Sequence, residues 1–263
     1  MAKGNRGGQR ASGQINNPAN IPAPPDDTNV ALVDTTNQKV SLDYQKFMDM
    51  SEDEKVDAMS AANDEGVPLH LADTSLQRIL YNMDLEDKPS IVDDATLDKM
   101  QGTEFFRTVN YVDRTRTRND IGFKAPGVAR QVMESDFTRL GAGGGTAHGE
   151  GLYFSDSYRE SQSGYGRVMN NVNATCTMRA KLNSNAKVIK KYNASNGVQN
   201  EINNNTKLGR LLKKVDSDSR MAVYGLAKGY NTLEVGNGYY VVWTRNAMTM
   251  SSKLKPYDGN KNW

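Results

Sequence analysis

The chain has 263 residues, of which 37% are hydrophobic and 24% charged, with a net charge of +2 and a mean hydropathy of −0.70. This length predicts one or two domains, and so polar a composition indicates that part of the chain joins no hydrophobic core. No apolar run approaches the roughly 18 residues of a membrane span. The single cysteine excludes an internal disulfide framework, and with two histidines a zinc cluster is not expected.

The first segment, residues 1–38, is rich in Gly, Asn, Gln and Pro and has few large apolar side chains. Such a segment cannot bury enough surface to offset its ordering entropy, so we expect a disordered N-terminal arm. Its early basic residues Lys3, Arg6 and Arg10 could bind nucleic acid or a docking partner weakly, or only aid solubility.

Residues 39–100 are predicted to form short acidic helices. Ser51 and Glu54 fit a capping box at the start of one helix. A second helix is expected after Asp73 or Thr74, and a third within the run SIVDDATLDKM. We expect this segment to dock onto or cover the C-terminal part of the chain.

The charge changes sign along the chain. Residues 41–100 contain 15 Asp and Glu against 5 Lys and Arg, whereas residues 101–263 contain 24 Lys and Arg against 13 Asp and Glu. A basic module can bind a phosphate-bearing ligand or nucleic acid. The alternative is a solvated basic face that complements the acidic segment of the same chain.

From residue 101 the pattern becomes many short strands with few helices, which is typical of an α+β domain over 101–263. Strands are expected in TEFFRTVNYV, GLYFSDS, NATCTMRAKL, AKVIKKY, NTLEV, GYYVVWTR and AMTMSSKLK, and helices in APGVARQVMES, 158–169, NEINNNTKLGRLLKKV and DSRMAVYGL. Neither a dinucleotide-binding G-x-G-x-x-G after a strand nor a P-loop motif is present, so a Rossmann or P-loop domain is not expected.

One segment, HGEGLYFSDSYRESQSGYG, resembles the nicotinamide-pocket segment of the ADP-ribosyltransferases, particularly the poly-ADP-ribose polymerase branch. That branch carries Gly-x-Gly-x-Tyr-Phe-Ala-Asp, a serine eight residues after the first Tyr, and then another Tyr. The last Tyr stands one position later here than is usual. The matching residues are Gly149, Gly151, Tyr153, Phe154, Ser155, Asp156, Ser161 and Tyr165.

Two further runs extend this resemblance over residues 103–252. FFRTVNY is similar to the first strand of the arginine branch of the superfamily, whereas the polymerase branch would have His-Gly there. KGYNTLEVGNGYYVVWTRNAMTMS is similar to the closing strands of bacterial and phage-encoded members. The resemblance implies an ADP-ribosyltransferase-like split antiparallel β-sheet core, preceded by the arm and the acidic helices.

The resemblance also implies NAD as a substrate. Arg107 would hold the NAD phosphates or ribose with its planar fork of donors. Tyr153 and Tyr165 would sandwich the flat nicotinamide ring. A backbone peptide beside Thr108 and the hydroxyl of Ser161 would bind the carboxamide. The other residues that the resemblance assigns to the NAD site are Gly149, Gly151, Phe154 and Ser155.

Catalysis in active relatives needs a glutamate, because breaking the glycosidic bond builds positive charge on the ribose. That glutamate lies in or just before the strand that NGYYVVW resembles, where this chain has Asn237, Gly238, Tyr239 and Tyr240. The nearest carboxylate is Glu234, which belongs to the preceding strand if VGNG is a hairpin turn. Glu234 and Tyr153 are the catalytic candidates; the alternative for Glu234 is a solvent-facing strand residue.

Simpler interpretations stand beside these roles. Arg107 could be an edge-strand residue facing solvent, Ser161 a surface helix residue, and the pair Tyr153 and Phe154 plain core aromatics. His148 could be a base, and the arginines of DRTRTRND could meet phosphates, although a solvated loop is the simpler interpretation. Cys176, within a strand pattern, is expected to be a small buried hydrophobe.

The sequence thus predicts an NAD-dependent ADP-ribosyltransferase that modifies a protein acceptor, with a phage-encoded source plausible, in the host cytoplasm or in a virion. The alternative is a catalytically degenerate protein of the same fold, serving as a virion or interaction protein. A basic nucleic-acid-binding protein is a third hypothesis, supported only by charge.

Overall fold

The structure, a computed structural model, describes residues 43–66, 74–85, 88–110, 121–134, 149, 151–165, 175–256 and 263. The chain divides into two units, Met1–Gln38 and Lys39–Trp263. The acidic helical segment and the basic module therefore belong to the same unit. The N-terminal arm, His70, His148 and the arginines of DRTRTRND lie outside the described residues.

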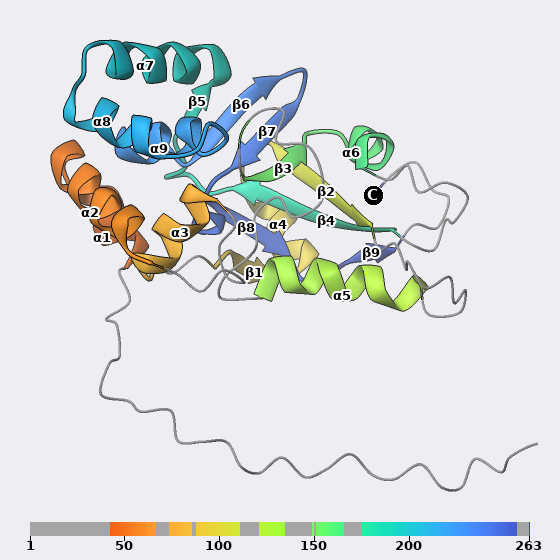
Figure 1. Cartoon of the computed structure of the whole chain (residues 1–263). Coiled ribbons are helices and arrows are strands. Elements are labelled where there is room, and N and C mark those ends of the chain that lie inside the picture. The colour runs from red at the N-terminus through yellow and green to blue at the C-terminus, as the bar shows by residue number, and fades with distance from the viewer. Residues whose placement is uncertain are drawn as a thin grey trace, which may run out of the picture. The chain divides into compact units, whose positions relative to one another are not determined.

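A sheet with nine strands among the described residues organises the second unit (Figure 1). The strand order is β1-β8-β4-β2-β3-β7-β6-β5, with β9 paired to β4. The pairs β1–β8 and β5–β6 are parallel and the others antiparallel. A mixed α/β architecture with a mainly antiparallel sheet is thus confirmed. The strands are β1 (Ser90–Val92), β2 (Glu104–Asn110), β3 (Leu152–Ser155), β4 (Thr175–Leu182), β5 (Val188–Lys190), β6 (Thr232–Gly236), β7 (Tyr239–Val242), β8 (Met248–Ser251) and β9 (Lys255–Pro256).

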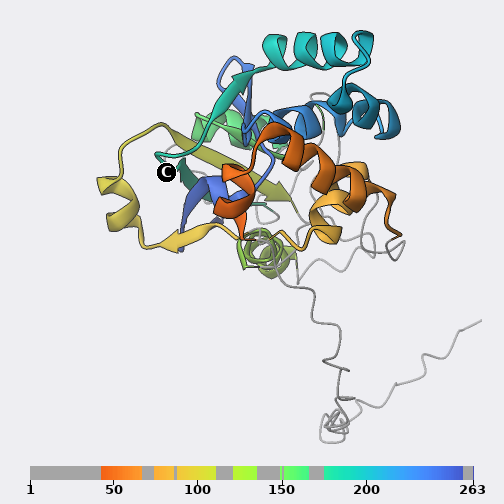
Figure 2. The ribbon, with the colours of Figure 1, turned by 90° about the vertical axis from the view of Figure 1, so that its left-hand side faces the viewer.

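The helices lie in several places around the sheet (Figures 1 and 2). The first three pack with the last three at one end of the sheet, while α5 runs along β2 and β4, and α6 contacts β2 and β3. The helices are α1 (Tyr44–Asp49), α2 (Glu52–Asp64), α3 (Ser75–Asn82), α4 (Asp94–Lys99), α5 (Ile121–Glu134), α6 (Tyr158–Tyr165), α7 (Lys191–Asn203), α8 (Lys207–Lys214) and α9 (Arg220–Ala227).

The predicted capping box at the start of α2 is confirmed. The Ser51 hydroxyl accepts from the Glu54 backbone N–H at 3.3 Å, and the Glu54 carboxylate accepts from the Ser51 backbone N–H at 2.8 Å. These bonds satisfy donors that a helix start leaves open. The buried side chains of Val56, Met59 and Ala62 then face the common core. Hence α2 is amphipathic and cannot bury its apolar face without the helices later in the chain.

The acidic helix α2 is paired with the basic module. Lys207 contacts Asp57 at 2.7 Å, Lys214 contacts Asp64 at 2.9 Å, and Lys228, just after α9, contacts Glu52 at 2.7 Å. Exposed pairs of this kind stabilise little individually. They show, however, that part of the basic face complements the acidic segment of the same chain, which weakens the charge argument for nucleic acid.

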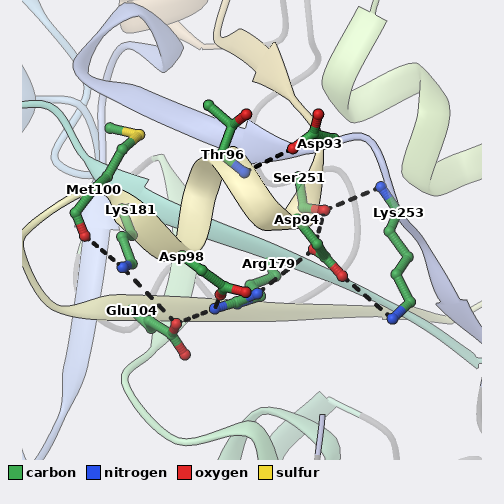
Figure 3. A network of polar contacts seen from close by, with 10 residues as sticks. All are labelled: Asp93, Asp94, Thr96, Asp98, Met100, Glu104, Arg179, Lys181, Ser251 and Lys253. Carbon is green, nitrogen blue, oxygen red and sulfur yellow. Dashed lines mark hydrogen bonds and ion pairs between the residues drawn. The ribbon is translucent and has the colours of Figure 1, made fainter.

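A buried arginine ties α4 to the sheet (Figure 3). Arg179 of β4 lies 3.5 Å from Asp94 and also contacts Asp98 and Glu104. Only 6% of Arg179 is exposed. Lys253 adds an ion pair to Asp94 at 3.2 Å. A buried guanidinium is tolerated here because three carboxylates compensate its charge.

The run NEINNNTKLGRLLKKV, expected to be one helix, instead spans two. Asn205 has φ +51°, a left-handed conformation that ends α7 and redirects the chain. The Thr206 hydroxyl then caps α8 by accepting from the Gly209 backbone N–H at 2.9 Å. A Cβ on Gly209 would lie 2.0 Å from the Glu201 carbonyl oxygen, so the two helices meet at the closest approach glycine allows.

Candidate functional site

The sheet is weakly joined between β2 and β3. Strand β2 pairs with β4 through seven residues, and β3 pairs with β7 through four. Between β2 and β3 the register has one pair, Phe106 opposite Ser155. Backbone donors and acceptors beyond that pair need other partners, so the junction is where side chains or a ligand can complete the hydrogen bonding.

Arg107 supplies one such bond. Its Nη1 donates to the carbonyl oxygen of Tyr153 at 2.9 Å, across the junction from β2 to β3. Arg107 is half-buried and lies on an interior strand, between β4 and β3. The edge-strand interpretation is therefore wrong. The structure holds the guanidinium at the point where the two halves of the sheet separate.

A cluster of three buried hydroxyls lies beside Arg107. Thr108 is 3.0 Å from Ser161 and 2.8 Å from Thr177, between hydroxyl oxygens. Ser161 lies on α6. Just before this helix, the Ser157 backbone N–H donates to the Ser155 hydroxyl at 3.2 Å. Ser161 is completely buried, so the surface interpretation is wrong. The sequence offered no signal for Thr177, which β2–β4 pairing brings opposite Thr108.

Residues named by the resemblance lie around this junction on two faces of the sheet, with Glu234 farther away on β6. Side chains alternate along a strand, and paired residues of antiparallel strands share a face. Arg107 therefore points away from the face that carries the hydroxyl cluster. One face carries Arg107, Phe154 and Glu234; the other carries Thr108, Tyr153, Ser155 and Ser161.

Packing accounts for the two glycines of the motif. Gly149 has φ +87°, and a Cβ there would lie 2.9 Å from the Asp218 carbonyl oxygen. Gly151 has φ +146°, and a Cβ there would lie 2.4 Å from Cγ1 of Val241. The Tyr153 hydroxyl donates to the Gly149 carbonyl and fastens this turn over β3. Packing therefore requires glycine at both positions, whether or not a ligand binds.

Gly151→Ala is therefore expected to lower the free energy of unfolding by about 2 kcal/mol, because the methyl group overpacks a buried contact. Urea unfolding would measure this loss. The matched control is Gly127→Ala in α5, where nothing lies within 4 Å of the added methyl and helix propensity favours alanine. Equal stability of the two variants would contradict the packing account.

Glu234 lies in β6, opposite Tyr240 of β7, which confirms that VGNG turns a hairpin. Strand β6 is the third strand from β2 in the sheet order. Three strand spacings place the Glu234 backbone about 14 Å from β2. Burial, with the charges of Glu234 and Asp156, raises the pKa of Tyr240. Glu234 is half-buried but is not brought to Arg107.

Aromatic rings pack next to Thr108, on the face of the sheet that carries the hydroxyl cluster. The ring of Phe106 lies 5.7 Å from that of Tyr158 and 5.8 Å from that of Trp263, between centroids. Tyr158 and Ser161 are one turn apart on α6, so the same helix places an aromatic ring and a hydroxyl against β2. Tyr165 ends this helix, and its side chain lies outside the described set.

Other chemistry finds little support in the part of the chain that the structure describes. Cys176 is fully buried, as expected, and burial raises the pKa of its thiol to about 11, so it stays protonated. The described residues contain no group of three or more His, Cys, Asp and Glu suited to a metal ion. Their helices include none with the length and apolarity needed to cross a membrane.

Comparison with known proteins identified no relative: no family model, no curated protein and no solved structure matches this chain. The chemistry of the junction must therefore be argued from its own residues.

Proposed function

We propose that this chain binds NAD at the β2–β3 junction and transfers its ADP-ribose to a protein acceptor. One observation carries the proposal. Residues that the resemblance selects from separate segments touch here, Arg107 to Tyr153 at 2.9 Å and Thr108 to Ser161 at 3.0 Å. The members of these pairs are 46 and 53 positions apart in sequence.

The groups at the junction suit the parts of NAD. The guanidinium of Arg107 can meet a diphosphate with two parallel N–H donors. The hydroxyls of Thr108 and Ser161 can each donate and accept, which is what a carboxamide requires. The Tyr153 ring supplies an aromatic surface on the same face as these hydroxyls. The hydroxyls and the Tyr153 ring thus lie on one face of the sheet and the Arg107 guanidinium on the other, so the proposal places NAD within the junction itself, where one residue pair joins β2 to β3.

A non-catalytic protein of the same architecture is the second candidate, serving as a virion or interaction protein. A specific observation favours it. Gly238, at the position where the resemblance expects a glutamate, has no side chain and a φ of +76°. A protein that kept Arg107 and lost that carboxylate could bind NAD, or a partner, without reacting.

Two measurements on the wild-type chain test these proposals. The first is the melting temperature with and without millimolar NAD, since a ligand that binds only the folded state raises it. The second is release of nicotinamide from NAD, with labelled ADP-ribose traced onto proteins of a bacterial lysate. A thermal shift with release and labelling supports the transferase. A shift without release supports the non-catalytic protein. No saturable shift contradicts NAD binding altogether.

A further inference from the structure

The start of β7 is covered by a carboxylate from a neighbouring strand. A Cβ built on Gly238 would lie 2.2 Å from Oδ1 and 2.9 Å from Oδ2 of Asp156. The Asp156 backbone N–H donates to the Gly238 carbonyl at 2.9 Å, one residue beyond the β3–β7 pairing. The carboxylate of Asp156 therefore occupies the space that a side chain at position 238 would enter.

Asp156 also lies on the side of the sheet that carries Arg107. Phe106 and Ser155 are paired and share one face. Arg107 follows Phe106 on β2, and Asp156 directly follows the last residue of β3, so both point to the other face, where Asp156 also acts on Tyr240. In an antiparallel pair such residues are diagonal neighbours with Cα atoms about 7–8 Å apart, within reach of long side chains. The distance from the Glu234 backbone to β2 is about twice as large, because β3 and β7 lie between β2 and β6.

Neighbouring acidic groups are less suitable. Glu160 accepts a hydrogen bond from the Tyr239 hydroxyl at 3.0 Å, and Tyr239 pairs with Ser155 on the opposite face. The carboxylate of Asp156 is exposed, and no lysine or arginine among the described residues forms an ion pair with it. On the same face of the sheet, the Phe105 and Tyr240 rings pack edge to face with centroids 4.6 Å apart.

From this geometry we propose that Asp156 is the catalytic carboxylate of the ADP-ribosyl transfer, in place of Glu234. The inference rests on the proposed function, because it assigns a residue to that reaction. If Arg107 holds the diphosphate, a carboxylate at Gly238 on the same face of the sheet would face the ribose that is attached to that diphosphate. Its negative charge can then stabilise positive charge that develops there.

The step that Asp156 assists is a substitution at C1′ of the ribose. The bond between C1′ and N1 of nicotinamide breaks, and both electrons stay on N1, so nicotinamide leaves as a neutral molecule. Positive charge develops on C1′ and the ring oxygen. The nucleophilic atom of the acceptor forms the new bond to C1′ and releases its proton to solvent. Asp156 remains ionised and accepts a hydrogen bond from a ribose hydroxyl.

Asp156→Asn tests the assignment on the full-length chain with NAD as the substrate. We expect kcat for nicotinamide release to fall about 100-fold or more, with KM changed by less than about threefold, since the lost interaction acts in the transition state. The NAD-induced thermal shift should persist. Asp64→Asn on α2, the same chemical change at a distant carboxylate, should leave kcat unchanged.

Gly238→Ala gives a second test that removes no carboxylate from the chain. Its methyl group would enter the space of the Asp156 carboxylate and displace it, so kcat should fall while the NAD-induced thermal shift persists. A large loss with Glu234→Gln and none with Asp156→Asn overturns the assignment and leaves the proposed function intact. If the wild-type chain releases no nicotinamide, the proposed transfer reaction fails and the assignment fails with it.

Discussion

Replacing Arg107 with alanine is expected to lower kcat/KM for NAD about 100- to 1,000-fold, which is the usual effect of removing a preorganised charged donor. The guanidinium is the cation at the β2–β3 junction and is held there by its bond to the Tyr153 carbonyl. The measurement is nicotinamide release as a function of NAD concentration. Circular dichroism and urea unfolding should show that the variant still folds.

Two further variants test whether the loss of activity is specific to the Arg107 guanidinium. Arg107→Lys keeps the charge but has no planar fork, so it should recover only part of the activity. Arg210→Ala is the matched control, because Arg210 of α8 also donates to a backbone carbonyl, that of Asn205 at 3.0 Å, but its side chain is exposed. If Arg107→Ala and Arg210→Ala had equal activities, the junction would not be the NAD site.

Replacing Arg179 with methionine is expected to lower the free energy of unfolding by about 1–2 kcal/mol, because the change removes the shared cation of three carboxylates that are themselves partly exposed to water. These are Asp94, Asp98 and Glu104, which lie around the guanidinium in Figure 3. Urea unfolding at neutral pH would measure the loss. Lys253→Met, which removes an ion pair to Asp94 from a side chain 62% exposed, should cost less than about 1 kcal/mol.

The same network predicts how stability depends on pH. Burial alone would raise the pKa of Asp94, but hydrogen bonds from Ser251 and Lys253 and the charges of Lys253 and Arg179 hold it below its ordinary value. A carboxyl with a lowered pKa stabilises the fold above its unfolded pKa, and this stabilisation is lost as pH falls through the folded pKa. Arg179→Met should therefore lose less stability than the wild type on acidification below about pH 4. Parallel acid curves would show that Arg179 does not set this pKa.

Local features of this protein could be derived from its sequence alone. The capping box of Ser51 and Glu54, the hairpin that puts Glu234 before β7, and the buried strand around Cys176 all arise from patterns a few residues long. Such features are determined by side chains next to each other in the chain, so a short window contains the whole cause.

The candidate site could be derived only in part. The motif pointed to Arg107, Tyr153 and Ser161, but it gave Asp156 no role and offered nothing on Thr177. Asp156 and Thr177 are brought to the site by the pairing of β3 with β7 and of β2 with β4. This strand order cannot be inferred from the sequence of any one strand. The break between α7 and α8 around Asn205 cannot be predicted for a similar reason, since the close packing of Gly209 against Glu201 selects it.

By itself, then, the sequence determined the residue types available for chemistry and the local elements that carry them. Only the tertiary structure decided that β2 is an interior strand, that one residue pair joins it to β3, and that the Asp156 carboxylate covers Gly238. The physical reason is the range of the interactions. Caps and turns form between near neighbours, whereas strand order and the faces that side chains share depend on contacts between segments far apart in the chain.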